Sequence, residues 1–591
     1  LPGPFGYVVG NPPWQGRGTK QIAQHFVLRI PEYLEPQGRA CILLPSKVLF
    51  NRSSNQFQTQ WLQSSTLEKV VQLADYSFIL FKNAMCPSII ARFTAAPPDI
   101  VTHRVDYETP KVRRNDRREG IIPVAPADRK QIPLRELLHE ALAQKAPILW
   151  KRYLWGTPRD NSFLRNLLEM PALGEIVGPP KDGNRWVKGQ GFQPDSHGTS
   201  PNPKDPWWAP SDLYISAKGK IPGLFLITED CQSVGDRFRK LHRTRDRRIY
   251  KPPLVLISQG IGKGALPKVV YCDFPILFQH TLQAIAGPQE DEDLLLFLTL
   301  YLRSKLARYF LFHTAANWGT ERDKVHLDEL LRLPFPLPGS EDASPDAAEI
   351  VRAIAQKARA LKKKIEREFA ASSSAGGFRL SGDSPLFSAA KRQKMVAALE
   401  AEVEPLIYQY FDLIDQEIIL IEDTVEVFIS SATPHRLDAS IPTLEPIHKN
   451  TLPTYQAGLS AYAAILSGTL NSWAAQATSP VMVSASGGVY GQAGLAMVSL
   501  ELTTDQALPF YKKDLSAGLG DVLVQLYNTA SQQTGGRLDY LRGIIWFDES
   551  CIHIVKPFTV EYWTRTAALN DAAEIYARIA EARQTTRKGS N

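Results

Sequence analysis

The chain has 591 residues, of which 44% are hydrophobic and 22% are charged. At about 100–200 residues per domain this length predicts three or four folded units, and the composition excludes a mainly disordered, collagenous or membrane-embedded protein. The 68 Lys and Arg against 61 Asp and Glu give a formal net charge of +7, which is too small a bias for this length to imply nucleic acid by itself.

The five cysteines are scattered and form no C-x-x-C pair, so neither a disulfide framework nor a thiolate zinc site is indicated. No stretch reaches the ~18 consecutive apolar residues of a spanning helix, and the first residues lack the layout of a signal peptide. We therefore expect a cytoplasmic protein without a membrane partner and without a bound metal.

The first hundred residues alternate between strand and helix patterns. Strands are expected at 7–10, 40–44, 67–75 and 88–93, and an amphipathic helix at 22–34. Such alternation predicts an α/β layer fold, and so few strands make only half of a doubly wound sheet. We predict a partial, Rossmann-like sheet over residues 1–97.

Four further segments follow. A Pro-containing stretch dense in charge predicts a linker or an exposed hairpin, and a region rich in Gly, Pro and Trp predicts a mixed α/β recognition domain. Two long helical patterns predict a spacer, and alternating segments before a last helix predict a small α+β domain. In chain order their boundaries are 98–132, 133–340, 341–432 and 433–591.

The sharpest motif is Asn11-Pro12-Pro13-Trp14, directly after the apolar strand 7–10. It resembles the active-site tetrapeptide of the amino-methylating DNA methyltransferases. The resemblance continues through residues 26–50 and through Phe78 to Ser88, where that family packs a Phe against the target base. We assign this role to Phe81, with Phe78 as the alternative.

The resemblance implies a role for each residue of the tetrapeptide. The Asn11 side chain and the Pro12 backbone would offer carbonyl oxygens to the hydrogens of adenine N6, beside the methyl donor S-adenosylmethionine. Pro13 would stiffen this ledge, and Trp14 would stack on a base flipped out of the duplex. An exposed turn with an aromatic residue is the alternative interpretation, since Asn and Pro are common in turns.

The order of motifs in the gamma branch of this family places the cofactor-binding motifs before the tetrapeptide. Only ten residues precede Asn11 here. We therefore expect an upstream segment or a separate polypeptide to carry those motifs. The internal alternative is a permuted order, in which the Gly-rich turn of residues 254–264 would bind the cofactor, but a lone Gly-rich turn is a weak signal.

Two groups of residues are expected to bind double-stranded DNA. Eight cationic residues fall within fifteen positions and suit phosphate contacts, whose strength falls with salt; a solvated charged face is the alternative. A polar loop closing the recognition domain supplies three more. The expected DNA-binding residues are Arg237, Arg239, Lys240, Arg243, Arg245, Arg247, Arg248, Lys251, Asn317, Arg322 and Lys324.

Two functions from different classes fit these features. The first is a portion of a site-specific DNA adenine-N6 methyltransferase in a restriction-modification or phage-defence system. The second is a DNA-recognition subunit whose methylase half is inactive and which positions a partner nuclease or helicase. The Asn at position 11 favours adenine N6 over cytosine N4 without deciding between them.

Overall fold

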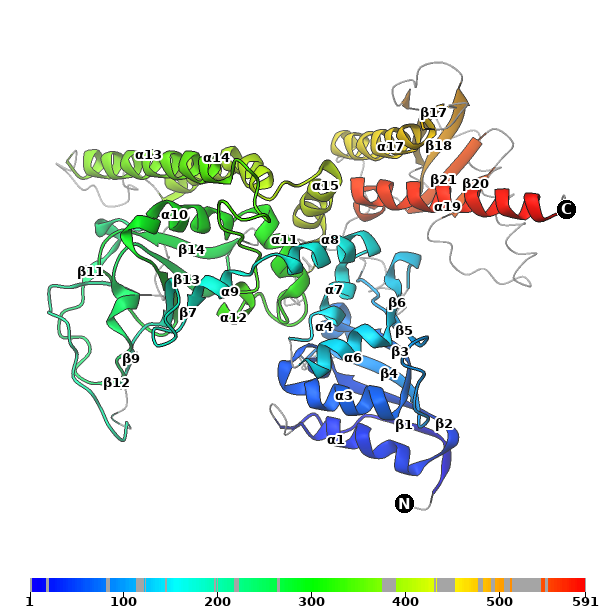
Figure 1. Ribbon diagram of the computed structural model, residues 1–591, viewed down its shortest axis with the longest axis horizontal. Coiled ribbons are helices and arrows are strands. Elements are labelled where there is room, and N and C mark those ends of the chain that lie inside the picture. Colours follow the sequence, from blue (N-terminus) through cyan, green and yellow to red (C-terminus); the bar gives the residue numbers. More distant parts are fainter. Residues whose placement is uncertain are drawn as a thin grey trace. The chain divides into compact units, whose positions relative to one another are not determined.

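The computed structural model divides into two units, Ile148–Ile421 and a second that comprises Leu1–Pro147 and Glu422–Asn591. It describes residues 3–16, 21–80, 86–112, 122, 124–143, 146–195, 198, 200–216, 223–262, 266–374, 389–429, 432, 452–476, 482–490, 495–503, 511–512, 544–547, 551–557 and 559–589. The whole is a mixed α/β structure with several sheets (Figure 1).

The N-terminal sheet has six strands in the order β1-β2-β4-β3-β5-β6. Its strands are β1 (Phe5–Gly10), β2 (Leu34–Pro45), β3 (Thr66–Gln72), β4 (Ser88–Thr94), β5 (Arg104–Glu108) and β6 (Arg129–Pro133). β1 and β2 pair in parallel, as do β3 and β5, whereas β4 and β6 run antiparallel to their neighbours. Consequently β1, β2, β3 and β5 all end at the same edge of the sheet.

Helices cover one face of this sheet, in front of the strands in Figure 1. They include α1 (Ile22–Arg29), α3 (Asn55–Ser64) and α6 (Leu134–Leu142); the short α2 (Lys47–Phe50) and α4 (Ser77–Leu80) follow β2 and β3. Trp61 of α3 packs edge-on against Phe93 of β4, with ring centroids 5.6 Å apart. The other face carries cross-strand ion pairs, Lys69 with Glu108 at 2.8 Å and Arg92 with Glu68 at 2.7 Å.

The second unit is built around a five-stranded sheet of order β14-β13-β16-β8-β7, flanked by smaller sheets of order β11-β10-β15 and β12-β9. The strands are β7 (Val177–Gly178), β8 (Trp186–Gln190), β9 (Gln193–Pro194), β10 (Leu213–Ile215), β11 (Gln232–Ser233), β12 (Leu241–Arg243), β13 (Leu254–Ile261), β14 (Pro267–Cys272), β15 (Leu277–Phe278) and β16 (Leu282–Ala286). Antiparallel pairing dominates the large sheet, and the remaining strands are too short to give a clear alternating pattern.

Helices precede and follow these strands. They are α7 (Leu149–Trp155), α8 (Pro158–Glu169), α9 (Leu173–Ile176), α10 (Glu292–Tyr301), α11 (Lys305–Thr314), α12 (Leu327–Leu330), α13 (Ala347–Ser374), α14 (Ala389–Tyr410) and α15 (Asp415–Asp423). α13 and α14 lie side by side over α10 (Figure 1).

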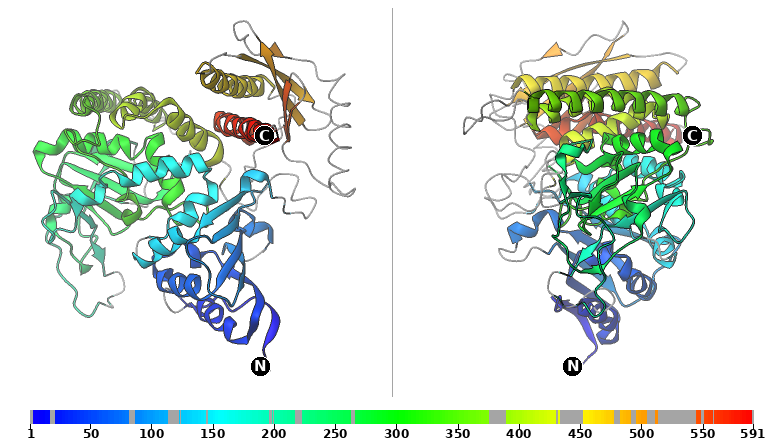
Figure 2. Two further views of the ribbon diagram at one scale, coloured as in Figure 1. Left: turned by 45° about the vertical axis from the view of Figure 1, so that its right-hand side comes forward. Right: turned by 90° about the vertical axis from the view of Figure 1, so that its left-hand side faces the viewer.

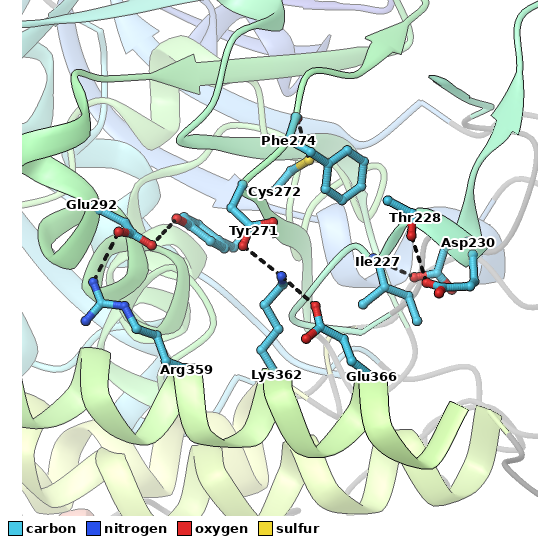
Figure 3. A network of polar contacts seen from close by, with 12 residues as sticks. Ile227, Thr228, Asp230, Tyr271, Cys272, Phe274, Glu292, Arg359, Lys362 and Glu366 are labelled. Carbon is cyan, nitrogen blue, oxygen red and sulfur yellow. Dashed lines mark hydrogen bonds and ion pairs between the residues drawn. The ribbon is translucent and has the colours of Figure 1, made fainter. Parts of the chain in front are cut away.

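Polar contacts fix α13 to the recognition sheet (Figure 3). The Tyr271 hydroxyl of β14 donates to Glu292 at 3.1 Å, and Glu292 in turn lies 3.4 Å from Arg359 of α13. Lys362, one turn further along α13, bonds Asp273 at 2.7 Å. Because of these contacts, the predicted spacer at 341–432 is not a separate element, and its helices up to Ile421 belong to the recognition unit.

The C-terminal part is a five-stranded sheet with two long helices on one face (Figure 2). The helices are α17 (Leu452–Ala474) and α19 (Arg565–Gly589), and the strands, in spatial order, are β19 (Tyr511–Lys512), β17 (Met482–Tyr490), β18 (Leu495–Thr503), β21 (Cys551–Pro557) and β20 (Ile544–Phe547). Between sheet and helices, Lys556 forms a buried ion pair with Asp571, which also accepts the hydroxyl hydrogen of Tyr462.

One predicted boundary is wrong. Residues 98–132 were expected to be a linker, but β5 and β6 lie within them and extend the N-terminal sheet to Pro133. In β5 the side chains of Val105 and Tyr107 are fully buried, while the charged residues that alternate with them point to the opposite face.

Of the helices in the described ranges, none combines the length and apolar character that a membrane span requires.

Candidate active site and nucleic-acid interface

The tetrapeptide Asn11–Trp14 begins where β1 ends, at the edge shared by the ends of β2, β3 and β5. Ligands of open α/β sheets bind at such carboxyl edges. Asn11 is exposed, Pro12 is buried, and Trp14 is half-buried. Within the described residues the Asn11 amide makes no hydrogen bond, so its oxygen is available to an external donor.

A buried row of polar side chains ties these strand ends together. The Ser46 hydroxyl, just after β2, donates to Gln72 Oε1 at the end of β3 at 2.7 Å, and Gln72 Nε2 donates to the hydroxyl of Tyr107 in β5 at 3.5 Å. All three side chains are at most 1% exposed. Burial raises the pKa of Tyr107 above its ordinary value, so the phenol stays neutral. Satisfied buried polar groups of this kind fix the geometry of the edge.

The segment after β3 reaches the same edge as the tetrapeptide. Asp75 accepts the backbone N–H of Val112 at 2.7 Å, which holds the start of this segment in place. Phe78 lies on the short helix α4 that follows. Phe81, to which the role of packing on the target base was assigned, lies outside the described residues, so that assignment stays a prediction.

Apolar side chains of β1 are exposed on the face of the sheet opposite the helices. Tyr7 is 75% exposed and Val9 is 82% exposed, although they pair with Arg39 and Cys41 inside the parallel part of the sheet. β1 is also an edge strand, with β2 as its partner in the sheet. Parallel strands are normally covered on both faces, so this surface has the character of an interface.

The cationic run 237–251 folds as a turn, the short strand β12 and a single 3₁₀ turn at Arg247–Tyr250, and not as one helix. Several of its side chains already have partners within the chain. Arg237 bonds Gln232, Lys240 pairs with Asp205, Arg247 stacks on Trp207, and Arg248 bonds both Asp246 and the Pro180 carbonyl.

The remaining cations of this run differ from those four. Arg239, Arg243 and Lys251 are exposed, and their side chains make no hydrogen bond or ion pair within the described residues. Arg245 is partly buried and bonds only the side chain of Gln190, at 3.3 Å. Positive charge in this region is therefore available mainly at these four positions.

The polar loop with the other expected DNA-binding residues is anchored to β13. Its backbone bonds the strand end through Ile261 N to Asp323 O at 3.0 Å and Val325 N to Gln259 O at 3.0 Å. The Asn317 carbonyl accepts the backbone N–H groups of Thr320 and Arg322, which shapes the loop. Arg322 is exposed, and Lys324 and Asn317 are partly exposed.

Sheet register brings the two cationic regions to one end of the recognition sheet. Ile257 of β13 pairs with Gln283 of β16, and Gln283 pairs with Gln190 of β8. The end of β13 that holds the loop and the end of β8 that contacts Arg245 therefore lie along the same edge. This placement has no signal in the sequence, because β8 precedes β13 by more than sixty positions and is joined to it only through β16.

The Gly-rich stretch 254–264 begins with β13, which is followed in the described residues by the strand β14. β13 leads into β14 as an antiparallel neighbour, with Ser258 opposite Lys268 and Ile261 opposite Pro267. A nucleotide-binding glycine turn instead leads from a strand into a helix, whose N-terminus faces the ligand. The permuted alternative is thus disfavoured.

Residues that sequence reasoning missed are those that support the site. Ser46 and Gln72 were not singled out, although each is a polar residue at the end of a buried strand, a signal that was available in the sequence. Gln190 was missed because a lone Gln in a Gly-rich segment has no distinctive pattern.

Within the described residues, no group of three or more His, Cys, Asp or Glu lies close enough together to hold a metal ion.

No protein-family model matches the chain, and no curated protein matches it. Among solved structures, one of a type I R-M system aligns with 28% of this chain and 42% of its own, at 17% identity and a TM-score of 0.21. A modification subunit of a putative type I restriction enzyme from Vibrio vulnificus aligns over 22% and 34%, at 17% identity and a TM-score of 0.18. The Type IIL restriction-modification enzyme MmeI in complex with DNA aligns over 70% and 56%, at 11% identity and a TM-score of 0.38.

The chain thus spans less than two thirds of the length of each of these three structures. TM-scores below 0.5 do not establish a common fold. The function of the chain is therefore argued from its own residues.

Proposed function

We propose that this chain is the catalytic and target-recognising portion of a DNA adenine-N6 methyltransferase in a restriction-modification or phage-defence system. The observation that carries the proposal is the exposed, unengaged amide of Asn11 at the carboxyl edge of parallel strands, followed by Pro12, Pro13 and Trp14. Because Asn11 is exposed, its amide oxygen can accept a hydrogen bond from a ligand that approaches this edge of the sheet.

The proposed chemistry needs hydrogen-bond acceptors more than charged side chains. The Asn11 side-chain oxygen and the Pro12 carbonyl oxygen accept hydrogen bonds from N6, which directs the nitrogen lone pair out of the ring plane. Trp14 offers an aromatic face to the extruded base, which offsets part of the lost stacking. Asn11 and Pro12 would also border S-adenosylmethionine, which supplies an activated methyl group when bound.

The exposed face of β1 supports the need for a second, cofactor-binding half. Tyr7 and Val9 would be covered if further strands and helices, from an upstream segment or a partner polypeptide, completed the sheet beside β1. The partner surface for DNA is the end of the recognition sheet, where Arg322 and Lys324 lie along the same edge as the contact between Gln190 and Arg245. Nuclease or helicase defence subunits are further proposed partners.

The decisive experiment is Asn11→Ala in the chain complemented with its cofactor-binding half. Methyl transfer to duplex DNA should fall by about 100-fold or more, because a positioned acceptor in the transition state is lost. Asn11→Asp keeps an acceptor and should retain more activity. DNA affinity should be unchanged in both variants, since neither alters the recognition unit.

Two outcomes would contradict the proposal. Equal activity of Asn11→Ala and the unaltered chain would remove the tetrapeptide from catalysis. Absence of any methyl transfer by the complemented, unaltered chain, with DNA binding kept, would favour a recognition subunit that positions a nuclease or helicase. Nucleoside analysis of the product separates 6-methyladenine from 4-methylcytosine.

A further inference from the structure

Arg245 has a backbone conformation that its side chain does not explain. Its φ is +86°, in the left-handed region that residues other than glycine rarely adopt. In the described residues only Asp412 shares this property among non-glycine residues. Strained backbone of this kind is typically held by its surroundings at functional positions.

The Arg245 side chain is also incompletely satisfied. Its Nε is buried and has no hydrogen-bond partner within the described residues, and one Nη2 hydrogen is donated to Gln190 Oε1 at 3.3 Å. Among the residues that the structure describes, no carboxylate pairs with Arg245, whereas Arg248 and Lys240 in the same run each have one. Burial, together with the nearby Arg243 cation, lowers the pKa of the Arg245 guanidinium, which reflects a positive charge without a counter-charge.

Gln190 is held rigidly in the position from which it contacts Arg245. It lies between two glycines at which a Cβ would collide with neighbours: 3.0 Å from Ile249 Cγ2 at Gly189 and 2.1 Å from the Phe278 carbonyl oxygen at Gly191. Ile249 and Phe278 are at most 1% exposed. The chain therefore cannot shift here without disturbing the core, whereas the Gln190 side chain itself is exposed.

Aromatic side chains pack beside the segment of Gln190 and beside the cationic run that contains Arg245. Phe192, directly after this segment, contacts Trp208 and Phe238 with ring centroids 4.6 and 4.9 Å away. Tyr250, after the cationic run, contacts Trp207 at 5.4 Å. Packed aromatic rings therefore support the segments on which Gln190 and Arg245 lie. Such packing is required to hold a side chain in a fixed orientation.

We propose that Arg245, oriented by Gln190, reads a guanine through the major groove, and does not serve as a phosphate contact. The proposal rests on the DNA-recognition role given above. The free Nη hydrogens of an oriented guanidinium match the O6 and N7 acceptors of guanine, which is the commonest specific contact of Arg with DNA. A phosphate contact needs only a flexible charge, which Arg239 and Lys251 already offer without strain.

The test uses the full chain and a randomised duplex DNA library, with bound sequences selected and read out, so it needs no catalysis. Arg245→Lys keeps the charge but loses the planar fork. It should abolish the preference for guanine at one position, about a 10-fold or larger change in relative affinity, with the same salt dependence. Gln190→Ala should weaken the same preference. The matched control, Arg239→Ala, should lower affinity for all sequences alike and reduce the salt slope by about one.

Arg245→Gly separates a loss of reading from a loss of folding. Glycine adopts a φ of +86° freely, so the melting temperature should stay the same or rise while the guanine preference disappears. A guanine preference that survives Arg245→Lys and Arg245→Gly would overturn the proposal, as would a uniform loss of affinity matching that of Arg239→Ala. If the unaltered chain selects no DNA sequence at all, both the proposed function and this inference fail. If it selects a sequence and the Arg245 variants select the same one, only this inference fails.

Discussion

The N-terminal sheet and the recognition sheet cover their apolar residues differently. In β13 of the recognition sheet, Leu254, Val255 and Leu256 are at most 1% exposed, so successive residues on both faces are buried. In β1 of the N-terminal sheet, Tyr7 and Val9 are exposed, and Gly6, Val8 and Gly10, which alternate with them, are only partly buried. The recognition sheet has the burial of a finished core, and the N-terminal sheet has that of a core that lacks a covering layer.

This difference bears on what each region can do alone. A fully covered sheet can hold recognition residues in fixed positions without help, as the Gln190 segment illustrates. An uncovered parallel edge leaves the neighbouring loop, here Asn11–Trp14, dependent on whatever completes the sheet. We therefore expect DNA recognition to be a property of the chain and methyl transfer to be a property of the assembled protein.

The largest effect should come from placing a charge on the open face of β1. Val9→Lys should lower complementation by the cofactor-binding half by about 100-fold or more, because burying an unpaired ammonium costs several kcal/mol. The free energy of unfolding of the chain by itself should change by less than about 0.5 kcal/mol, since Val9 is 82% exposed. Titration calorimetry measures the affinity between the two halves and so measures this effect.

A matched control exists in Val101→Lys, at a loop position that is 76% exposed. It introduces the same charge on the same part of the chain and should leave complementation unchanged. If Val9→Lys and Val101→Lys behaved alike, the open face of β1 would not be an interface, and the difference between the two sheets would have no functional meaning.

The second prediction tests whether α14 is part of the finished core. Arg392 is 7% exposed and bonds Asp230 at 2.8 Å and the Phe225 carbonyl. Arg392→Met should destabilise the recognition unit by about 3 kcal/mol, because a nearly buried carboxylate loses its partner. Hydrogen exchange of peptides from β13 and β14 measures the change.

Peptides from the N-terminal sheet serve as an internal reference and should exchange as before. Arg352→Met is the matched substitution on α13, where the ion pair with Glu349 is 4.0 Å long and exposed on both sides. Arg352→Met should change the free energy of hydrogen exchange in the β13 and β14 peptides by less than about 0.5 kcal/mol. Uniform loss of protection in both units after Arg392→Met would contradict the division between them.

Much of the N-terminal sheet could be predicted because its strands are continuous apolar runs. Residues 40–44 and 88–93 were expected as strands and lie within β2 and β4. β5 is harder to recognise because its charged residues Arg104, Asp106 and Glu108 favour a linker, although Val105 and Tyr107 alternate with them as a half-buried strand requires.

The recognition unit could be predicted only in outline. Its strands of two or three residues carry no period, and its architecture depends on pairings between distant segments. The cationic run was visible in the sequence, but which cations were already paired was not, because partners such as Asp205 and the Pro180 carbonyl come from elsewhere in the chain. A positive φ at Arg245 likewise has no sequence signal, since Arg does not favour that conformation.

The smallest predicted effect is a pH dependence confined to the recognition unit. Glu404 of α14 accepts the backbone N–H of Lys305 at the start of α11 at 2.8 Å. Burial raises the pKa of its carboxyl from 4.5 to about 7, against the opposing influence of Arg308 and Lys305. Because the folded state holds this proton more tightly than the unfolded chain, stability falls as the pH rises from about 4.5 to about 7.

Glu404→Gln keeps an acceptor for Lys305 and removes the titration. The variant should match the unaltered chain below pH 4.5 and exceed it by about 1–2 kcal/mol above pH 7, a value reduced from the full shift because Glu404 is only partly buried. Exchange rates of α11 and α14 peptides at pH 5 and pH 8, corrected for intrinsic exchange, measure it. A gain of equal size at both pH values would mean that Glu404 acts through packing and not through its charge, and an equal gain in the N-terminal sheet would mean that the two regions unfold as one.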